Sequence, residues 1–468
     1  MARAPGEEHA PAPGVARLTG GALVAAASFV AALGGLLFGY DTGVVAAALP
    51  YISDAFALGE TMKQVVTAAL LAGAVAGVIV GGKLADRFGR KRTLTGVTVL
   101  YALATLGSAV APATGWLIVS RVFLGVAIGI SSLVVPTYIA ELASPRNRGR
   151  LVSLHQFMVT VGILMAYLVG YGLSESASWR WMIGVGVLPA VLMSVGLLAL
   201  PESPRWLLSH DREAEARGVL VRTRRADEVE AEISEIREAV RAEGRITYRE
   251  LLGPRYRRWV SVGVVAAGAS QVVGVNAIIY YVPTILEDEG FGKTAAIGVS
   301  VAIGVVNVLF TLPALLWIDR VGRRPWILGG TAVIVLALVV IGIVFLFPLQ
   351  GATVSWLIVV LMIYESAFAC SLGIAIWLVN SEIFPNNVRG QAASFGIVTH
   401  WAMNLVVSLT VLTLISALGA SVVFWIYALL GALCLGYLYR WLPETKNRSL
   451  EEIEASLTAD RSDSTRTH

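Results

Sequence analysis

The most charged loops of this chain occur twice, and this repeat limits the possible folds more than any other feature of the sequence. Asp86-Arg87-Phe88-Gly89-Arg90 returns as Asp319-Arg320-Val321-Gly322-Arg323, at an offset of 233 residues. The step from Glu141 to Arg148-Gly149 returns from Glu382 to Arg389-Gly390, at an offset of 241 residues. Pro201-Glu202 returns as Pro443-Glu444, at an offset of 242 residues. The chain therefore consists of two homologous halves placed end to end.

The composition places both halves in a membrane. Hydrophobic residues make up 56% of the chain and charged residues 15%, whereas charged residues are about a quarter of an ordinary soluble domain. Twelve apolar segments approach or exceed the ~20 residues that a spanning helix needs. They are 19–49, 62–83, 93–111, 116–140, 150–172, 180–200, 259–286, 295–317, 325–347, 354–380, 392–416 and 419–441. The sequence therefore predicts an all-α membrane protein with twelve transmembrane helices in two six-helix bundles. Parallel repeats of this size in a membrane chain are typical of transporters with a substrate site between the halves.

The apolar segments also define the domain organisation. We expect an N-terminal tail at 1–18, a first bundle at 19–200, a linker at 201–258, a second bundle at 259–441 and a C-terminal tail at 442–468. The linker is rich in charges, and Val229, Ile233, Ile236 and Val240 recur in it at helical spacing, which predicts short amphipathic helices. The linker is either a solvated spacer or a part of the inner gate.

Basic residues set the orientation, because cytoplasmic loops carry an excess of Lys and Arg. Lys63, Arg180 and Lys293 lie in one set of loops, Arg121 lies within a span, and the remaining 32 of the 36 share the other side. We therefore expect a multi-pass protein of the cytoplasmic membrane with both termini in the cytoplasm. The net charge of +4 then reflects this topology, and no nucleic-acid partner is expected.

Five motifs in this order resemble the sugar porter branch of the major facilitator superfamily, over Gly20 to Glu454. The residues are Gly39-Tyr40-Asp41-Thr42-Gly43, the stretch from Gly82 to Lys91, the stretch from Pro201 to Leu207, the stretch from Gln271 to Asn276 with Tyr280-Tyr281, and Pro443-Glu444-Thr445-Lys446. The resemblance implies two six-helix bundles that rock around a central cavity.

Uncharged polar side chains within the spans are candidates for binding a neutral sugar. Amides both donate and accept hydrogen bonds, which suits the hydroxyls of a sugar, and a Trp face can pack on a pyranose ring. The resemblance aligns Gln156, Gln271, Asn276, Asn307 and Trp377 with sugar-site residues, and His400 and Trp401 are further candidates. The alternative is that these amides only bond neighbouring helices together. Three departures from the family pattern, Ser270, Ile374 and His400, make the expected substrate a sugar or polyol rather than glucose in particular.

Two charged residues within the spans are candidates for proton coupling. Asp41 lies in a long uncharged stretch of the first span, and Arg121 is the basic residue that lies within a span, away from its ends. Proton-coupled sugar porters have an Asp and an Arg at these positions, so the resemblance favours symport; the alternative is a static salt bridge. Glu365 has no known family counterpart. It is either a second titrating group or a neutral acid hydrogen-bonded between helices.

The repeated loops provide candidates for a cytoplasmic gate. Opposite charges at helix ends can form pairs when the inner side is closed and separate when it opens, and a network of them can bias a two-state carrier. The candidates are Arg90, Glu141, Arg148, Arg324, Glu382 and Arg389. A solvated charged face is the alternative.

Together these features predict proton-coupled import of a monosaccharide or related polyol by alternating access. A passive sugar facilitator and a non-transporting sugar sensor are the alternatives. An enzyme is not expected, because the sequence shows no phosphate-binding glycine loop, no pair of histidines at metal spacing and no nucleophile beside a base. The expected partners are a small neutral sugar or polyol and the lipid bilayer. The expected coupling ion is a proton, with no cofactor or metal, and we expect the chain to function as a monomer.

Overall fold

The structure is a computed structural model that describes residues 20–143, 148–242, 248–254, 256–374, 379, 383, 384, 388–444 and 446. The regular structure in these residues is helical. The first half contains α1 (Gly21–Phe56), α2 (Glu60–Phe88), α3 (Arg90–Ala109), α4 (Thr114–Leu142), α5 (Arg148–Gly172), α6 (Trp179–Gly184) and α7 (Val187–Leu198). The second half contains α12 (Arg257–Val272), α13 (Val275–Asp288), α14 (Lys293–Val321), α15 (Arg323–Val344), α16 (Ala352–Cys370), α18 (Arg389–Leu418) and α19 (Ala420–Trp441).

The helices account for the predicted membrane crossings. Within the described residues, eleven helical spans are long and apolar enough to cross a bilayer, with α6 and α7 forming one of them and α12 and α13 another. Helix α3 is not among these eleven; it has 20 residues, long enough to cross a bilayer, and begins with Arg90, Lys91 and Arg92. The predicted all-α membrane fold is confirmed, and the described helices are consistent with the predicted count of twelve.

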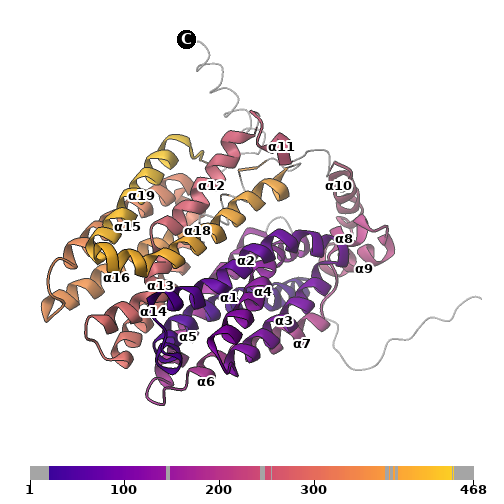
Figure 1. The fold of residues 1–468 in the computed structure, drawn as a ribbon. Coiled ribbons are helices and arrows are strands. Elements are labelled where there is room, and N and C mark those ends of the chain that lie inside the picture. Colours follow the sequence, from indigo (N-terminus) through magenta and orange to yellow (C-terminus); the bar gives the residue numbers. More distant parts are fainter. Residues whose placement is uncertain are drawn as a thin grey trace, which may run out of the picture.

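The crossings form two bundles, which Figure 1 shows side by side. In the first bundle α1 packs on α5 and α2 on α4; in the second α15 packs on α19 and α12 on α18. Helices α1 and α5 are in backbone contact, since a Cβ on Gly39 would lie only 1.9 Å from the carbonyl oxygen of Val159. Such close contact is how small residues join helices in a membrane. The bundles meet through α1 with α13, α2 with α18, and α5 with α14.

Two crossings are interrupted where the sequence suggests continuous apolar segments. The sixth breaks between α6 and α7, and the seventh breaks between α12 and α13. At the second break Gly274 has φ 80°, a left-handed conformation that favours glycine. The ring of Tyr427 also fills the space beside Gly274, where a Cβ would lie 2.5 Å from it. The break gives the seventh crossing two short helices whose ends carry polar side chains.

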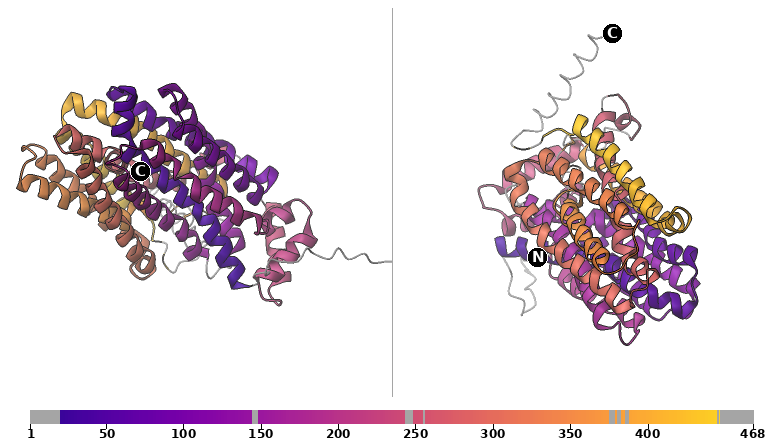
Figure 2. Two further views of the ribbon diagram at one scale, coloured as in Figure 1. Left: turned by 90° about the horizontal axis from the view of Figure 1, so that it is seen from below. Right: turned by 90° about the vertical axis from the view of Figure 1, so that its left-hand side faces the viewer.

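The linker forms the short helices α8 (Pro204–Ser209), α9 (Glu213–Thr223), α10 (Val229–Ala242) and α11 (Tyr248–Leu251). Arg224 joins this group to the first bundle: its guanidinium donates to the carbonyl oxygens of Leu142 at 2.8 Å and Ala143 at 3.1 Å, at the end of α4. It also pairs with Glu232 on α10 at 2.6 Å. Figure 2 shows the linker helices at the end of the first bundle. They are therefore docked on that bundle rather than held apart from it.

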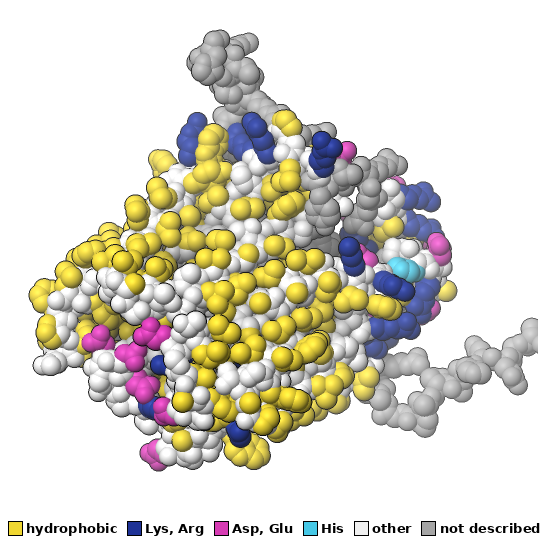
Figure 3. All heavy atoms as spheres, in the orientation of Figure 1, with side chains coloured by type: hydrophobic (Ala, Val, Ile, Leu, Met, Phe, Trp, Pro, Cys, Tyr) yellow, Lys and Arg dark blue, Asp and Glu magenta, His cyan; other side chains and the backbone are white. Residues whose placement is uncertain are grey.

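Charged side chains gather on two opposite faces of the molecule, with an apolar belt between them. In Figure 3 Lys and Arg lie along the top and right, around the linker helices and the ends of the second bundle, while a group of acids lies at the lower left. We call the first region the basic face; it contains the turn between α2 and α3 and the turn between α14 and α15. We call the opposite region the outer face; it contains the end of α1 and the start of α14.

Candidate functional site

Asp41 and Arg121 lie together inside the first bundle. Asp41 is on α1 and Arg121 on α4, and their side chains are only 4% and 2% exposed. An Nη2 of Arg121 lies 3.5 Å from Oδ2 of Asp41, and Nε of Arg121 donates to the carbonyl oxygen of Val66 at 2.8 Å. Arg121 is therefore anchored to α2 independently of Asp41, whereas Oδ2 of Asp41 has no hydrogen bond among the described residues.

The second bundle reaches this pair through Tyr280 on α13. A narrow gap with no room for a water molecule lies between the side chains of Asp41, Thr42, Val45, Thr67, Leu70, Arg121 and Tyr280. The Tyr280 hydroxyl also accepts a hydrogen bond from Nδ2 of Asn404 on α18 at 3.3 Å. The candidate proton-coupling pair therefore faces the interface between the bundles rather than the lipid.

Four polar side chains of the second bundle form one buried cluster, which we call the amide cluster: Ser270, Gln271, Asn276 and His400. Nε2 of Gln271 lies 3.1 Å from both Oγ of Ser270 and Nδ1 of His400. Oε1 of Gln271 accepts from Nδ2 of Asn276, across the break between α12 and α13. Ser270 also donates to the carbonyl oxygen of Ala267 at 2.7 Å. The amide cluster thus unites three of the predicted substrate residues with the departure at Ser270.

Trp401 adjoins this cluster and contacts the first bundle. Its side chain is fully buried, its ring centroid lies 5.6 Å from that of His400, and Nε1 donates to Oγ of Ser132 on α4 at 3.3 Å. Phe38 on α1 packs against the same indole, with ring centroids 5.0 Å apart. Trp401 therefore bridges the two bundles beside the amide cluster.

The remaining predicted substrate residues lie apart from this group or outside the described residues. Gln156 is half-buried on α5, next to the fully buried His155. Asn307 on α14 donates its amide to Oε1 of Glu365 on α16, so the structure places it in a pair with an acid rather than in the amide cluster. Trp377 lies outside the described residues.

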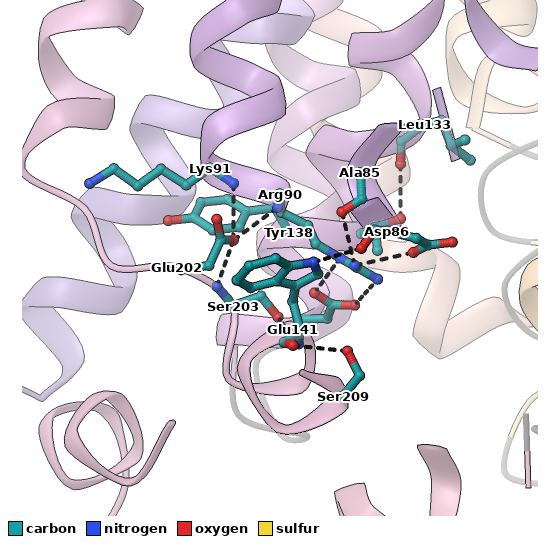
Figure 4. A network of polar contacts seen from close by, with 12 residues as sticks. Ala85, Asp86, Arg90, Lys91, Leu133, Tyr138, Glu141, Glu202, Ser203 and Ser209 are labelled. Atoms are coloured by element: carbon teal, nitrogen blue, oxygen red, sulfur yellow. Dashed lines mark hydrogen bonds and ion pairs between the residues drawn. The ribbon is translucent and has the colours of Figure 1, made fainter. Parts of the chain in front are cut away.

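The first repeat of the charged loops forms an ordered network on the basic face (Figure 4). The guanidinium of Arg90 lies 3.1 Å from each carboxylate oxygen of Glu141 and 3.2 Å from Asp86. Oε1 of Glu202 accepts hydrogen bonds from the backbone N–H groups of Arg90, Lys91 and Ser203 at 2.9, 3.0 and 2.9 Å. The carboxylate thus satisfies N–H groups that begin helix α3, where an anion is favoured.

The second repeat uses the same geometry. Glu444 accepts from the backbone N–H groups of Arg323 at 3.0 Å and Arg324 at 3.1 Å, which begin helix α15. In both repeats the preceding residue is a glycine with positive φ, 97° at Gly89 and 108° at Gly322, and a Cβ there would collide with the capping carboxylate. This packing explains why the Gly-Arg and Pro-Glu motifs occur together in each half.

The structure describes the side chains of three of the six predicted gate residues. Arg90 and Glu141 form the ion pair described above, and Nη2 of Arg324 donates to the carbonyl oxygen of Tyr439 at 2.7 Å. Glu382 and the side chains of Arg148 and Arg389 lie outside the described residues. The gate across the two bundles therefore stays a prediction.

Polar contacts also join the bundles at the outer face. Lys293 at the start of α14 pairs with Asp54 on α1, and its Nζ lies 3.5 Å from Glu287. The hydroxyl of Thr413 on α18 lies 3.0 Å from the amide of Gln64 on α2. Pattern reasoning did not predict these contacts, because each of them joins helices that are far apart in the chain.

Sequence reasoning also missed the helix-capping role of Glu202 and Glu444 and the position of Tyr280. The first two could have been found, because the offsets place an acid and a Gly-Arg turn in both halves. As for metals, the described residues contain no group of three or more His, Cys, Asp or Glu side chains that could hold an ion.

Comparison with known proteins identifies sugar transporters as relatives of this chain. A family model described as "Sugar (and other) transporter" matches residues 27–457. YwtG of Bacillus subtilis (strain 168), named only as a candidate metabolite transport protein, is 40% identical over 92% of this chain and 94% of its own. The galactose-proton symporter of Escherichia coli (strain K12) is 38% identical over 92% of this chain and 94% of its own. A solved structure of the proton:xylose symporter XylE with 6-bromo-6-deoxy-D-glucose is 30% identical, has a TM-score of 0.80, and is matched over 92% of this chain and 98% of that chain.

Proposed function

This chain belongs to the sugar transporter family of the major facilitator superfamily, and from that premise we propose that it imports a monosaccharide or related polyol together with a proton. It is a multi-pass membrane transporter and not an enzyme. Transport occurs by alternating access, in which the two bundles rock around a central site. The proposed proton coupling rests mainly on the buried Asp41–Arg121 pair of the first bundle, which faces Tyr280 of the second bundle.

Asp41 binds the coupling proton in this account. When its carboxylate is protonated the ion pair is lost, while Arg121 keeps its hydrogen bond to Val66. Leaving one member of a buried pair without its partner costs about 3–5 kcal/mol, so protonation favours a conformation in which Arg121 gains water or another acceptor. The similarity to a galactose-proton symporter and to a proton:xylose symporter supports this coupling.

The amide cluster and Trp401 bind the sugar. In the structure Gln271 forms hydrogen bonds with Ser270, His400 and Asn276. A sugar hydroxyl that binds to Gln271 therefore replaces one of these partners and does not occupy an unused donor or acceptor. One exchanged neutral hydrogen bond contributes about 1 kcal/mol net, which predicts moderate affinity for each hydroxyl. Gln156, Asn307 and Trp377 remain proposed members of the same site. A neutral substrate is favoured, because the amide cluster and Trp401 include no Lys or Arg side chain.

The gate and the orientation complete the proposal. Arg90, Glu141, Arg148, Arg324, Glu382 and Arg389 act at the cytoplasmic side, which we identify with the basic face because cytoplasmic loops carry the excess of Lys and Arg. The protein resides in the cytoplasmic membrane with both termini inside, and it acts as a monomer with a proton as its coupling ion and no other cofactor.

Uptake into proteoliposomes tests the proposal. Labelled D-xylose, D-glucose, D-galactose, L-arabinose and myo-inositol are supplied with and without an inward proton gradient. We expect at least one of them to accumulate above its external concentration when the gradient is present, and only to equilibrate when it is absent. Equilibration under both conditions would instead identify a passive facilitator, and no uptake of any of these compounds would contradict sugar transport.

A further inference from the structure

Glu365 is a buried acid that the proposed coupling at Asp41 does not use. It lies on α16 with a relative exposure of 0%, and Nδ2 of Asn307 on the neighbouring α14 donates to its Oε1. Its Oε2 has no hydrogen-bond partner among the described residues. An ionisable residue within a membrane segment is expensive to keep and is by default a functional-site hypothesis.

The surroundings of Glu365 provide little compensation for a negative charge. Helices α14 and α15 both pack on α16. Tyr167 on α5 and Tyr364 on α16 itself are titratable groups within electrostatic reach of the carboxyl. On α15 the cations Arg323 and Arg324 lie in the first turn, on the basic face, and no ion pair to Glu365 occurs within the described residues. The ionised form therefore depends on a single amide donor, that of Asn307.

Asn307 links this acid to the proposed substrate. The amide of Asn307 can donate to a sugar hydroxyl or to Glu365, and in the structure it donates to Glu365. Thr311 does not compete for this amide nitrogen, because its hydroxyl donates to the Asn307 backbone carbonyl at 2.7 Å. A sugar that draws the amide away leaves the carboxylate buried without a donor, which is unfavourable for the charged form.

We propose that Glu365 is a second proton-binding site, linked to sugar binding through Asn307. The inference rests on the proposed sugar site, of which Asn307 is a member. Binding of sugar to Asn307 removes the donor from Oε1, and Glu365 takes up one proton from water in its place. When the sugar leaves, the amide returns and the proton is released. Because linkage is reciprocal, protonation of Glu365 raises the affinity for sugar.

The test measures sugar affinity at alkaline and acidic pH in a protein that lacks the first proton site. Purified Asp41→Asn protein is compared with the double variant Asp41→Asn/Glu365→Gln, with isothermal titration of whichever of D-xylose, D-glucose, D-galactose and L-arabinose binds best. Gln keeps an oxygen that accepts from Asn307 but cannot take up a proton, so a purely structural hydrogen bond survives the change. The control is Asp41→Asn/Glu289→Gln, which makes the same acid-to-amide change at an exposed position in the same background.

We expect the dissociation constant of the Asp41→Asn protein to fall about fivefold on acidification, the equivalent of one neutral hydrogen bond. The double variant should lose this fall, and the Glu289→Gln control should keep it. Equal pH dependence with and without Glu365→Gln would overturn the proposal. If the double variant does not fold, Asp41→Asn/Glu365→Asp replaces it: this variant retains an acid and must keep a pH dependence with a displaced midpoint, and an unchanged profile would contradict the proposal. Because every protein compared lacks Asp41, these outcomes are independent of whether Asp41 carries the first proton.

Discussion

Replacing Gln271 with alanine tests the amide cluster most specifically. Gln271 makes the contacts that hold the cluster together: its amide nitrogen reaches Ser270 and His400, and its oxygen accepts from Asn276. The substitution removes these contacts and leaves buried groups without a partner, at a cost of about 1–3 kcal/mol. If that cost falls on the sugar complex, the dissociation constant rises roughly 5- to 150-fold.

The assay is isothermal titration of purified wild-type and Gln271→Ala proteins with the sugar that the wild type transports best. Gln64→Ala is the matched control, because Gln64 is also a buried glutamine but bonds to Thr413 at the outer face. We expect its dissociation constant to stay within about twofold of the wild type, less than the effect of one neutral hydrogen bond. A folded Gln271→Ala protein with unchanged affinity, or an equal loss in Gln64→Ala, would refute the assignment of the cluster as the sugar site.

Three further substitutions test other parts of the structure. Gly89→Ala should lower the unfolding temperature, because the backbone of Gly89 (φ 97°, ψ 158°) lies in a region that costs other residues about 1–3 kcal/mol, and because a Cβ there would collide with Glu202. Exchanging the charges of Asp54 and Lys293 should restore whatever transport rate either single reversal removes, since the pair joins the bundles at the outer face. Ser270→Gln should change the ratio of transport efficiencies for glucose and the best substrate by up to about tenfold, because a longer amide reaches farther into the cluster.

Each of these three predictions has an outcome that would contradict it. Gly96→Ala is the control for Gly89, because Gly96 has open space around its Cβ position, and equal unfolding temperatures for the two variants would oppose the packing argument. A double charge exchange that is no faster than the single reversals would mean that Asp54 and Lys293 act independently. An unchanged sugar preference in Ser270→Gln would show that Ser270 does not influence the ligand.

The membrane fold could be predicted because a segment that is long and apolar enough to cross a bilayer is visible in the sequence itself. The duplicated loops also identified Arg90 and Glu141 as candidates, and the structure places them 3.1 Å apart. The break at Gly274 could not be predicted in the same way, because it depends on the ring of Tyr427, which comes from a helix about 150 residues later. Hydropathy registers that a segment is apolar, but not whether its helix is continuous.

The partners of individual polar residues were harder to predict than their presence. The family resemblance predicts that Asn307 binds the sugar. Its contact with Glu365, however, depends on how α14 and α16 are rotated about their axes. Similarly, Trp401 could be recognised as a candidate, whereas its contacts with Ser132 and Phe38 depend on how the two bundles dock. Contacts of this kind are set by tertiary packing, and a single sequence contains no local signal for them.

The most direct test of proton-coupled transport is accumulation by the Asp41→Asn protein. The amide preserves the shape of the side chain beside Arg121 but cannot bind and release the proton. Wild-type and variant proteins are reconstituted in proteoliposomes with an inward proton gradient, and both the steady-state internal concentration of labelled sugar and its exchange at equilibrium are measured. We predict that the wild type accumulates sugar and that Asp41→Asn exchanges it but accumulates less. The double variant Asp41→Asn/Glu365→Gln, which lacks both proposed proton sites, should exchange sugar without accumulation. Accumulation by Asp41→Asn to the wild-type level would contradict the account.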